Sequence, residues 1–535
     1  MIPDWSIPEA VVEERHYGRT LRCFADRPRS LHQLLADAVG RAPGREAVVA
    51  EDGRATWADL DRMAGRVAAN LARRGVARGT RVAMLLGNGR PFLWTLWACA
   101  RLGAIAVPLG TRLKSMEIAH AINDSEAHVL VFDADLAGNL PKPYETPMLP
   151  HRFAAGAAVE GAASFAVLLA PADAPEAVPV GEDEAAVILY TSGTTGRPKG
   201  AMLTGLGIIH SVMHYQHCLD LREGERAVLA VPASHVTGLV ALVALMARLA
   251  GTLILMSRFQ ARPFLALAER ERMTFTVLVP AALNLCLLDP DFARADLSAW
   301  RVCGYGGAPM PEATIAGLAR HLPHLRLANL YGATETTSPT TVMPPGGTAL
   351  APDSVGRVVP LGRVRIVDGD GNDLPPGGIG ELWIAGPMVV PGYWHDAEAT
   401  RANFAGGFWK SGDIGSIDSE GFVRVLDRKK DMINRGGYKI YSVEVENVLA
   451  DLPGVVEAAV VGRPCPVLGE RVHAFVLADD PAIDAARIRA FCAERLADYK
   501  VPETVTFVTE PLPRNANGKV VKTALRRMAG EGVPA

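Results

Sequence analysis

An apolar run that leads directly into a segment of Thr, Ser, Gly and Lys is the strongest constraint on this chain. Residues 185–190, AAVILY, have the length and composition of a buried β-strand. Residues 191–200, TSGTTGRPKG, follow at once. Glycines let backbone N–H groups approach an anion closely, hydroxyl groups donate hydrogen bonds, and lysine adds a positive charge. The stretch therefore predicts a strand that ends in a polyphosphate-binding loop.

This loop differs from a Walker A motif, in which a glycine is followed directly by Lys and then by Ser or Thr. Here Arg197 and Pro198 separate Gly196 from Lys199. The alternative is a surface hairpin rich in Gly and Thr. The length and unusual composition of the segment favour the phosphate-binding interpretation.

The bulk composition narrows the classes of protein to consider. A chain of 535 residues is too long for one hydrophobic core, so we expect at least two domains. A net charge of −3 gives no basic surface for nucleic acid, so none is expected as a partner. The seven cysteines form no C-x-x-C pair, which argues against a disulfide framework or a zinc site and favours a reduced, cytoplasmic setting. The amino-terminal residues do not have the pattern of a secretory signal.

Residues 227–247 carry no charge and are almost long enough to span a bilayer. Pro232, His235 and Gly238 interrupt them, so we expect a buried strand, a site loop and a buried helix instead of an integral membrane segment.

Residues 31–132 alternate between two patterns. Amphipathic stretches at 31–41, 56–74, 91–102 and 114–123 predict helices, and apolar runs at 46–50, 81–86, 104–108 and 128–132 predict strands. Short apolar strands separated by helices indicate a parallel sheet covered on both faces. Residues 140–184 are rich in Pro and Ala with weak periodicity, which predicts an irregular connector.

Three further polar loops follow predicted strands. Residues 226–232 lead into PASHVTG, 302–305 lead into GGAP, and 327–330 lead into YGATE. Parallel sheets bind ligands at the carboxyl ends of their strands. Together with the loop after residue 190, we expect four polar loops on one rim.

The pattern changes at DRKKD, residues 427–431. Upstream, residues 380–386 predict a strand of a small β-rich subdomain, followed by a structural turn at 390–394. Downstream, helices at 443–451 and 484–496 and strands at 455–461, 472–477 and 504–508 predict a compact α+β unit. The predicted fold is α/β, with a large domain of parallel or mixed sheets over residues 1–427 and a small domain over 428–535.

The predicted phosphate-binding loop, residues 191–200, is called the phosphate segment below. It resembles the signature of the adenylate-forming superfamily, which contains acyl- and aryl-CoA synthetases, luciferases and the adenylation domains of peptide synthetases. The resemblance extends from about residue 31 to about residue 527. It implies that the segment binds the phosphates of ATP and that Thr191 also acts in catalysis. The matching positions are Thr191, Ser192, Gly193, Thr194, Thr195, Gly196 and Lys199.

In the other loops of the large domain, His235 lies in P-x-x-H-x-x-G, which is similar to the motif whose His lies beside the reacting carboxylate in acyl-CoA synthetases. Spacing alone would favour a structural, hydrogen-bonded histidine. In Y-G-x-T-E, which includes Gly332, the resemblance implies that Tyr331 stacks on the purine, Thr334 approaches the α-phosphate and Glu335 binds Mg²⁺. The adenine and acyl sites would be lined by Gly307, Ala308 and Pro309.

The resemblance also implies that the small domain is mobile and hinges near Lys430, with functional residues on both sides of the hinge. Asp413 and Arg428 would bind the ribose, and Lys430 would be the pivot. The pair Gly436 and Gly437 would border the pantetheine tunnel for coenzyme A. Lys519, in a Gly-terminated turn, would bridge the carboxylate and the α-phosphate.

The predicted activity is that of an ATP-dependent acyl- or aryl-CoA synthetase with Mg²⁺ and coenzyme A, acting on a carboxylic acid. No Asp stands near His235 to pair with an ammonium group, so an α-amino acid is disfavoured. The alternative is a stand-alone ligase that loads a separate carrier protein. A catalytically dead nucleotide-binding regulator and a luciferase-like oxygenase are less favoured. The acid's identity stays open, and so does the oligomeric state, although dimers are common in the family.

The predicted acyl pocket is apolar with small walls, compatible with a fatty or aromatic acid. The residues that suggest it are Val236, Gly238, Leu239, Ala282, Tyr305, Gly306, Ala333 and Thr337.

Overall fold

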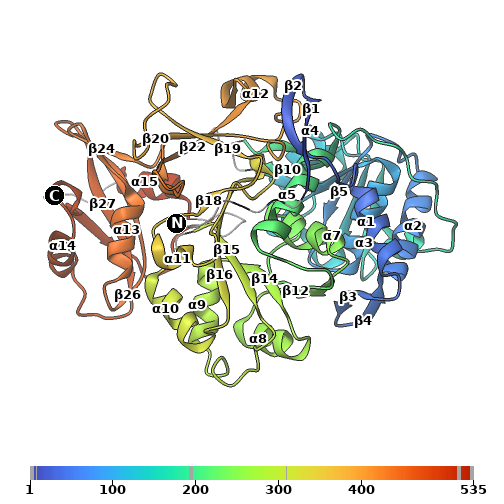
Figure 1. Ribbon diagram of the computed structural model, residues 1–535, viewed down its shortest axis with the longest axis horizontal. Coiled ribbons are helices and arrows are strands. Elements are labelled where there is room, and N and C mark those ends of the chain that lie inside the picture. The colour runs from blue at the N-terminus through green and yellow to red at the C-terminus, as the bar shows by residue number, and fades with distance from the viewer. Residues whose placement is uncertain are drawn as a thin grey trace. The chain divides into compact units, whose positions relative to one another are not determined.

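The computed structural model describes residues 5, 7, 9–191, 197–308, 310–514 and 520–530. The chain forms two compact units (Figure 1). The first comprises Met1–Val364 and Ile384–Trp409, and the second comprises Arg365–Trp383 and Lys410–Ala535. The α/β class predicted from the sequence is confirmed. The boundary after Asp427 and the hinge near Lys430 stay predictions.

One sheet of the first unit contains the strand that leads to the phosphate segment. Its order is β11-β10-β6-β5-β7-β8-β9. All its neighbouring strands pair in parallel except β10 and β11, which are antiparallel. The strands are β5 (Arg81–Leu85), β6 (Ile105–Pro108), β7 (Val129–Asp133), β8 (His151–Ala155), β9 (Ala163–Ser164), β10 (Ala185–Thr191) and β11 (Lys199–Thr204).

A second sheet of the same unit has the order β18-β17-β16-β15-β14-β12-β13-β3-β4. Its centre, from β16 to β3, is parallel. The strands are β3 (Glu46–Ala50), β4 (Gly53–Thr56), β12 (Arg226–Leu229), β13 (Thr252–Leu255), β14 (Phe275–Leu278), β15 (Val302–Gly306), β16 (Arg326–Tyr331), β17 (Thr341–Val342) and β18 (Arg357–Val358).

Two predictions about the strands need correction. The strand at 46–50 exists as β3, but it lies in the second sheet between β13 and β4 and does not pair with the predicted strands at 81–86, 104–108 and 128–132. An apolar run identifies a buried strand but not the distant strand beside it. Residues 140–184 are not wholly irregular either, because β8 and β9 extend the first sheet.

Helices of the first unit follow local signals closely. The capping box at Thr56 fixes where the second helix begins, because the Thr56 hydroxyl accepts from the Asp59 amide and the Asp59 carboxylate accepts from the Thr56 amide. The main helices are α1 (Leu31–Arg41), α2 (Trp57–Ala72), α3 (Arg90–Leu102), α4 (Ser115–Asp124), α5 (Gly205–Cys218), α8 (Ala261–Arg270), α9 (Pro280–Leu288), α10 (Glu312–His321) and α12 (Ala397–Asn403).

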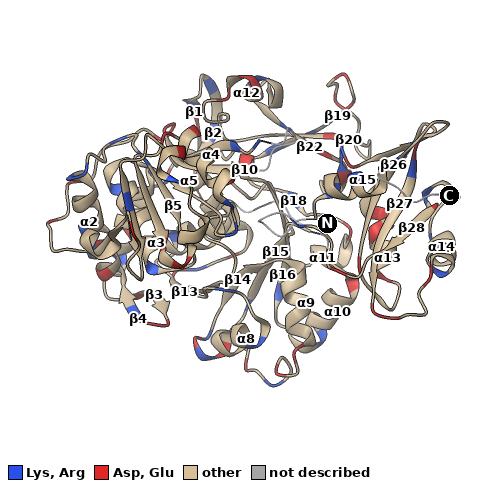
Figure 2. Cartoon of the chain, turned by 180° about the vertical axis from the view of Figure 1, so that it is seen from behind, with Lys and Arg blue, Asp and Glu red and all other residues tan. Residues whose placement is uncertain are grey.

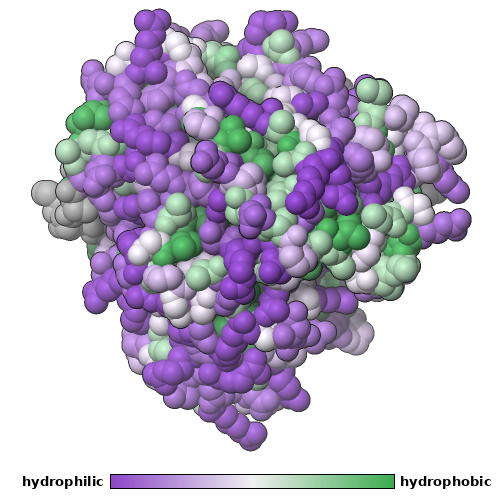
Figure 3. Space-filling view, turned by 90° about the vertical axis from the view of Figure 1, so that its right-hand side faces the viewer, coloured by the Kyte–Doolittle hydropathy of each residue, from purple (hydrophilic) through white to green (hydrophobic). Residues whose placement is uncertain are grey.

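The uncharged stretch 227–247 forms β12, the short helix α6 (Val236–Gly238), the π-helical turn η4 (Leu239–Ala244) and α7 (Leu245–Arg248). This matches the predicted strand, loop and buried helix. Within the described ranges, no helix combines the length and the apolar character needed to cross a bilayer. On the face of the molecule drawn in Figure 3, hydrophilic residues predominate and hydrophobic residues form small separate groups.

The second unit contains most of β20 (Gly380–Ala385) and β22 (Phe408–Ile417), all of β23 (Val423–Arg428), and a sheet of order β25-β24-β27-β26 with β28 beside β27. The strands of this sheet are β24 (Ile433–Arg435), β25 (Tyr438–Ile440), β26 (Val455–Cys465), β27 (Gly469–Ala478) and β28 (Thr504–Phe507). With α13 (Ser442–Ala450) and α14 (Ala485–Ala493) it encloses its own core, including Val445, Leu449 and Ile488. A further helix, α15 (Lys522–Gly530), follows.

Substitution of Gly306 tests how closely β15 and β16 approach each other, and substitution of Gly40 in a helix is the comparison. A Cβ on Gly306, in β15, would lie 2.1 Å from the carbonyl oxygen of Leu330 in β16, whereas a Cβ on Gly40, in α1, would meet nothing within 4 Å. We expect Gly306→Ala to lower the free energy of unfolding by about 1–3 kcal/mol because of overpacking. Gly40→Ala should raise it by about 0.5–1 kcal/mol because alanine favours the helix. Urea unfolding curves measure both. A Gly306→Ala variant as stable as the wild type would contradict this packing.

Candidate active site

Three of the predicted loops emerge at one edge of the second sheet. Because β12, β14, β15 and β16 are parallel, their carboxyl ends lie at the same edge. The loop after β12 carries His235, the loop after β15 carries Gly307 and Ala308, and the turn after β16 carries Glu335. The fourth loop follows β10, which belongs to the first sheet, so the predicted single rim is formed by two sheets.

Residues 390–394 join these two sheets. The Trp394 amide donates to the Gly200 carbonyl at 2.7 Å, and the Met202 amide donates to the Gly392 carbonyl at 3.2 Å. Both contacts hold the segment against β11. At its other end, the Val390 amide donates to the Glu335 carbonyl at 2.9 Å. The segment therefore connects the strand after the phosphate segment with the turn η5 (Thr334–Thr336).

Tyr393 is the centre of this junction. Its hydroxyl donates to Oε1 of Glu335 at 3.0 Å, and Nζ of Lys199 lies 5.3 Å from the centroid of its ring. Glu335 is 8% exposed, so its carboxylate needs hydrogen-bond donors to stay charged. Burial, reinforced by the charge of Glu335, raises the pKa of Tyr393 well above its usual range. The phenol therefore stays protonated and remains a donor.

Sequence reasoning missed Tyr393, because residues 390–394 were interpreted as a structural turn. Nothing in the spacing of a turn reveals which distant carboxylate its tyrosine meets. The structure thus brings Lys199 and Glu335, predicted separately, to the same tyrosine, Lys199 to the ring and Glu335 to the hydroxyl.

The strands that flank the phosphate segment are held against α4. Thr191 and Lys199 are directly opposite each other in the β10–β11 pair. Nε2 of His120 lies 2.9 Å from the Pro198 carbonyl oxygen, and the Tyr190 hydroxyl donates to Asp124 at 2.6 Å. Some predicted site residues lie outside the described residues, and their roles stay predictions: Ser192, Gly193, Thr194, Thr195, Gly196, Pro309 and Lys519.

His235 begins helix α6. Its Nδ1 accepts a hydrogen bond from the Thr237 amide at 3.3 Å, so in the neutral ring the proton lies on Nε2. The half-buried ring is therefore oriented by its own turn. This geometry accommodates both interpretations of His235, a structural cap and an Nε2–H donor toward a ligand.

The turn after β16 is conformationally strained, because Thr337 and Ser338 have positive φ values of 51° and 36°. Residues in such conformations cluster at functional sites.

The second unit brings its predicted ribose-binding residues together. Asp413 in β22 and Arg428 in β23 are register partners, and Nε of Arg428 lies 2.8 Å from the Asp413 carboxylate. Gly436 and Gly437 both adopt left-handed conformations, with φ of 58° and 92°, in the turn between β24 and β25. Lys430 is exposed, and its carbonyl accepts from Arg526 at 3.0 Å.

Sequence reasoning also missed a buried network just before the predicted hinge. The Asp427 carboxylate accepts from the backbone amide and the hydroxyl of Ser442, the latter at 2.7 Å. Nζ of Lys522 donates to the Ser442 hydroxyl at 2.5 Å and lies 2.6 Å from Glu446. The network attaches the end of β23 to α13 and α15.

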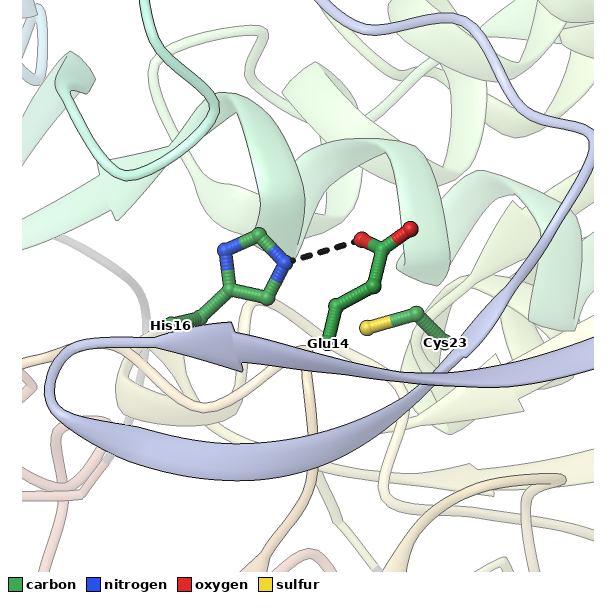
Figure 4. A group of neighbouring side chains, drawn as sticks. All are labelled: Glu14, His16 and Cys23. Atoms are coloured by element: carbon green, nitrogen blue, oxygen red, sulfur yellow. Dashed lines mark hydrogen bonds and ion pairs between the residues drawn. The ribbon is translucent and has the colours of Figure 1, made fainter.

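Glu14, His16 and Cys23 form the one group of potential metal ligands found among the described residues (Figure 4). Their ligand atoms lie within 4.8 Å of one another, on the hairpin of β1 (Val11–His16) and β2 (Arg19–Phe24). The Arg27 guanidinium bonds to Glu14, and mainly for this reason the pKa of Glu14 is lowered to about 2. Burial raises the pKa of the Cys23 thiol to about 11, so it is not a thiolate.

A metal ion would have to displace Arg27 from this group. Arg27 also bonds to Glu182 at 2.8 Å, and Nδ1 of His16 lies 2.6 Å from Asp183. We therefore interpret the cluster as an ion-pair network that attaches the amino-terminal hairpin to the segment preceding β10.

Comparison with known proteins agrees with this geometry. The family model "AMP-binding enzyme" matches residues 35–394, and "AMP-binding enzyme C-terminal domain" matches residues 444–519. The chain therefore belongs to the AMP-binding enzyme family. The resemblance to the adenylate-forming superfamily predicted from the sequence is confirmed.

Particular relatives narrow the class to ligases. The chain is 36% identical over 491 residues to the long-chain-fatty-acid–CoA ligase FadD13 of Mycobacterium tuberculosis, covering 90% of this chain and 95% of that protein. It is 39% identical over 480 residues to the feruloyl-CoA synthase of an Amycolatopsis species, covering 89% and 94%. The anthranilate CoA ligase AuaEII in complex with anthranoyl-AMP has a similar structure, with a TM-score of 0.87, 26% identity, and 95% and 98% coverage.

The hairpin network predicts a pH-dependent contribution to stability. Because the pKa of Glu14 falls from 4.5 to about 2 in the folded chain, its ion pairs stabilise the protein above about pH 4.5, and this contribution is lost as the pH falls toward 2. We expect Glu14→Gln to lower the urea midpoint at pH 7 and the difference from wild type to shrink as the pH is lowered. Glu13→Gln, at the exposed neighbouring position, is the control and should have little effect. An equal effect of both substitutions at pH 7 would contradict the network.

Proposed function

We propose that this protein is an ATP-dependent acid–thiol ligase that activates a carboxylic acid without an α-amino group. The acid is first converted to its acyl-adenylate, and the acyl group then passes to coenzyme A. The observation that carries the proposal is the junction of Lys199, Tyr393 and Glu335 between two sheets, in a chain that belongs to the AMP-binding family. The names of the relatives support a fatty or aromatic acid.

The chemistry explains why such an arrangement is needed. A carboxylate oxygen attacks the α-phosphorus of ATP, and the bond to the β-phosphate oxygen breaks, which releases pyrophosphate. Both reactants are anions, so cations and N–H donors must offset the charge that builds up in the transition state. In the second step a thiol sulfur attacks the acyl carbon, its proton goes to solvent, and AMP leaves.

We assign the remaining roles on this basis. Thr191 and Lys199, with residues 192–196, bind the phosphates. Tyr331, Gly332, Thr334, Gly307, Ala308 and Pro309 surround the adenine and the α-phosphate. His235 lies beside the acid, and Asp413 and Arg428 bind the ribose. Lys519 and the Gly436–Gly437 turn act in successive half-reactions, so the small domain, residues 428–535, rotates about Lys430 between them. Cytoplasmic location fits this use of ATP and coenzyme A.

Magnesium fits the residues present. Glu335 offers a buried carboxylate with one oxygen bound by Tyr393, and Mg²⁺ in such enzymes takes one or two carboxylates together with phosphate oxygens. When bound, the ion would neutralise phosphate charge. Tyr393 would orient Glu335 for this purpose.

The proposal is tested by incubating the purified protein with ATP, Mg²⁺ and a panel of fatty and aromatic acids, with and without coenzyme A. We expect AMP and pyrophosphate to form with at least one acid and a thioester to form only when coenzyme A is present. A carrier-protein ligase would release AMP rapidly only with a phosphopantetheinylated carrier. Formation of ADP without AMP would refute both.

Removing the carboxyl-terminal lysine should separate the two half-reactions. We expect Lys519→Ala to lose about 100-fold or more in adenylation, because the charge that joins the two anions is removed. Thioester formation from supplied acyl-adenylate should be largely kept. Pyrophosphate exchange and single-turnover thioester assays measure the two steps. Equal losses in both would contradict this division of roles.

The Tyr393 hydroxyl should be needed for positioning Glu335. We expect Tyr393→Phe to reduce adenylation about 10-fold, the lower range for a lost hydrogen bond to a charged group, and to raise the KM for MgATP. Tyr144→Phe is a matched control, because Tyr144 is 79% exposed. A Tyr393→Phe enzyme with wild-type kcat and KM for MgATP would show that the contact has no part in the reaction.

A further inference from the structure

A second charged region lies on the edge of the second sheet that is opposite to the candidate active site. A hollow of about 690 Å³ opens there, lined by Arg54, Arg226, Arg270, Glu271, Arg272, Thr274, Ser298, Ala299 and Arg301. Arg226 begins β12, and Thr274 and Arg301 directly precede β14 and β15. These are the amino ends of the strands whose carboxyl ends carry the active-site loops (Figure 1). We call the five arginines and their hollow the arginine basin.

One carboxylate holds three of the guanidinium groups together. Glu271, just after α8, is 4% exposed and forms ion pairs with Arg54 at 2.9 Å, Arg226 at 3.0 Å and Arg270 at 3.1 Å. Glu46 is shared in the same way by Arg54 and Arg226. Sharing carboxylates keeps the cations close to one another. Figure 2, in which the chain is seen from behind, shows Lys and Arg positions on α8.

The carboxylates do not use all of the arginine donors. Each guanidinium has five N–H groups. Arg270 bonds to Glu271 through Nε, and Arg301 bonds to Glu225 through one terminal nitrogen. The side chains of Arg54, Arg270 and Arg301 are 49%, 67% and 41% exposed. Four carboxylates face the five arginines, the fourth being Asp296, whose pKa is lowered mainly by Ser298 and also by Arg272.

Arg272 occupies a position that the backbone would fill better with glycine. It follows α8 with φ of 49°, and its amide donates to Glu269 as the helix ends. A left-handed conformation is unfavourable for a residue other than glycine, because its Cβ approaches the backbone. Among the described residues, its guanidinium makes no hydrogen bond or ion pair. What the side chain adds is therefore positive charge on the rim of the hollow.

We propose that the arginine basin binds an anion that carries two or more phosphate groups, at a site separate from the active site. Arginine forks match phosphate oxygens in pairs, and all of the cations in the basin are arginines. The hollow is large enough for several phosphate groups. A free polyphosphorylated molecule and the headgroups of an anionic lipid surface share this chemistry.

The test compares two variants of the full chain that lose the same charge. Arg270→Ser with Arg272→Gly removes two basin cations, and the glycine also relieves the left-handed backbone, so the variant should fold. Arg222→Ser with Arg294→Ser removes two cations outside the basin, whose side chains are 74% and 82% exposed. Thermal unfolding and the KM for ATP establish that both variants keep their fold and their active site.

Inorganic tripolyphosphate, titrated by calorimetry at low salt, is the first probe. We expect wild type and the control variant to show one binding event more than the basin variant, or the same event at least 10-fold tighter, and this difference should weaken as salt is raised. Superimposable isotherms for the basin and control variants would overturn the proposal, because the arginines would then be a purely structural ion-pair network.

Sedimentation with vesicles distinguishes the two sources of phosphate. Vesicles of phosphatidylcholine with phosphatidylglycerol would retain wild type and the control variant, but not the basin variant, if lipid headgroups are the ligand. Tripolyphosphate binding without vesicle binding would support a free polyphosphorylated molecule.

Discussion

The hydrogen bond from Tyr393 to the buried carboxylate of Glu335 is the interaction on which the arrangement of the site depends. A carboxylate at this depth would be costly without donors, and the tyrosine that supplies one belongs to the segment that ties β11 to the turn after β16. Because the two sheets meet through this segment, Lys199 of one sheet and the carboxylate that follows a strand of the other lie beside the same tyrosine side chain. A single hydrogen bond thus helps to fix the relative positions of two motifs that are distant in sequence.

The charged groups at the edges of the second sheet relate this fold to anion binding. Parallel strands present their carboxyl ends, and the loops attached to them, at one edge, where backbone N–H groups and a few charged side chains can meet a nucleotide. The net charge of −3 shows that the phosphate affinity we propose must come from such local groups. The amino edge of the same sheet carries cations of its own, arranged around Glu271, so the two edges offer different environments to anions.

Much of the secondary structure could be predicted from the sequence because its signals are local. The helix at 31–41 and the strand at 46–50 have the predicted bounds, and the elements of the carboxyl-terminal unit lie within a few residues of their predicted positions. The motifs also predicted most residues of the candidate site, and the roles of those residues stay predictions. Pairings between strands and contacts between side chains that are distant in sequence could not be predicted, because periodicity reports only on local structure. Examples are the pairing of β3 with β13, the contact of Tyr393 with Glu335, and the network of Asp427 with Ser442 and Lys522.

The central claim is that the acid itself attacks the α-phosphate of ATP. Its most direct test uses an accepted acid labelled with ¹⁸O in the carboxylate, with coenzyme A, ATP and Mg²⁺, and mass spectrometry of the products. The account predicts one ¹⁸O atom in AMP and none in pyrophosphate, because the bond broken in the second step leaves a carboxylate oxygen on the nucleotide. Label in inorganic phosphate, or unlabelled AMP formed together with thioester, would contradict it.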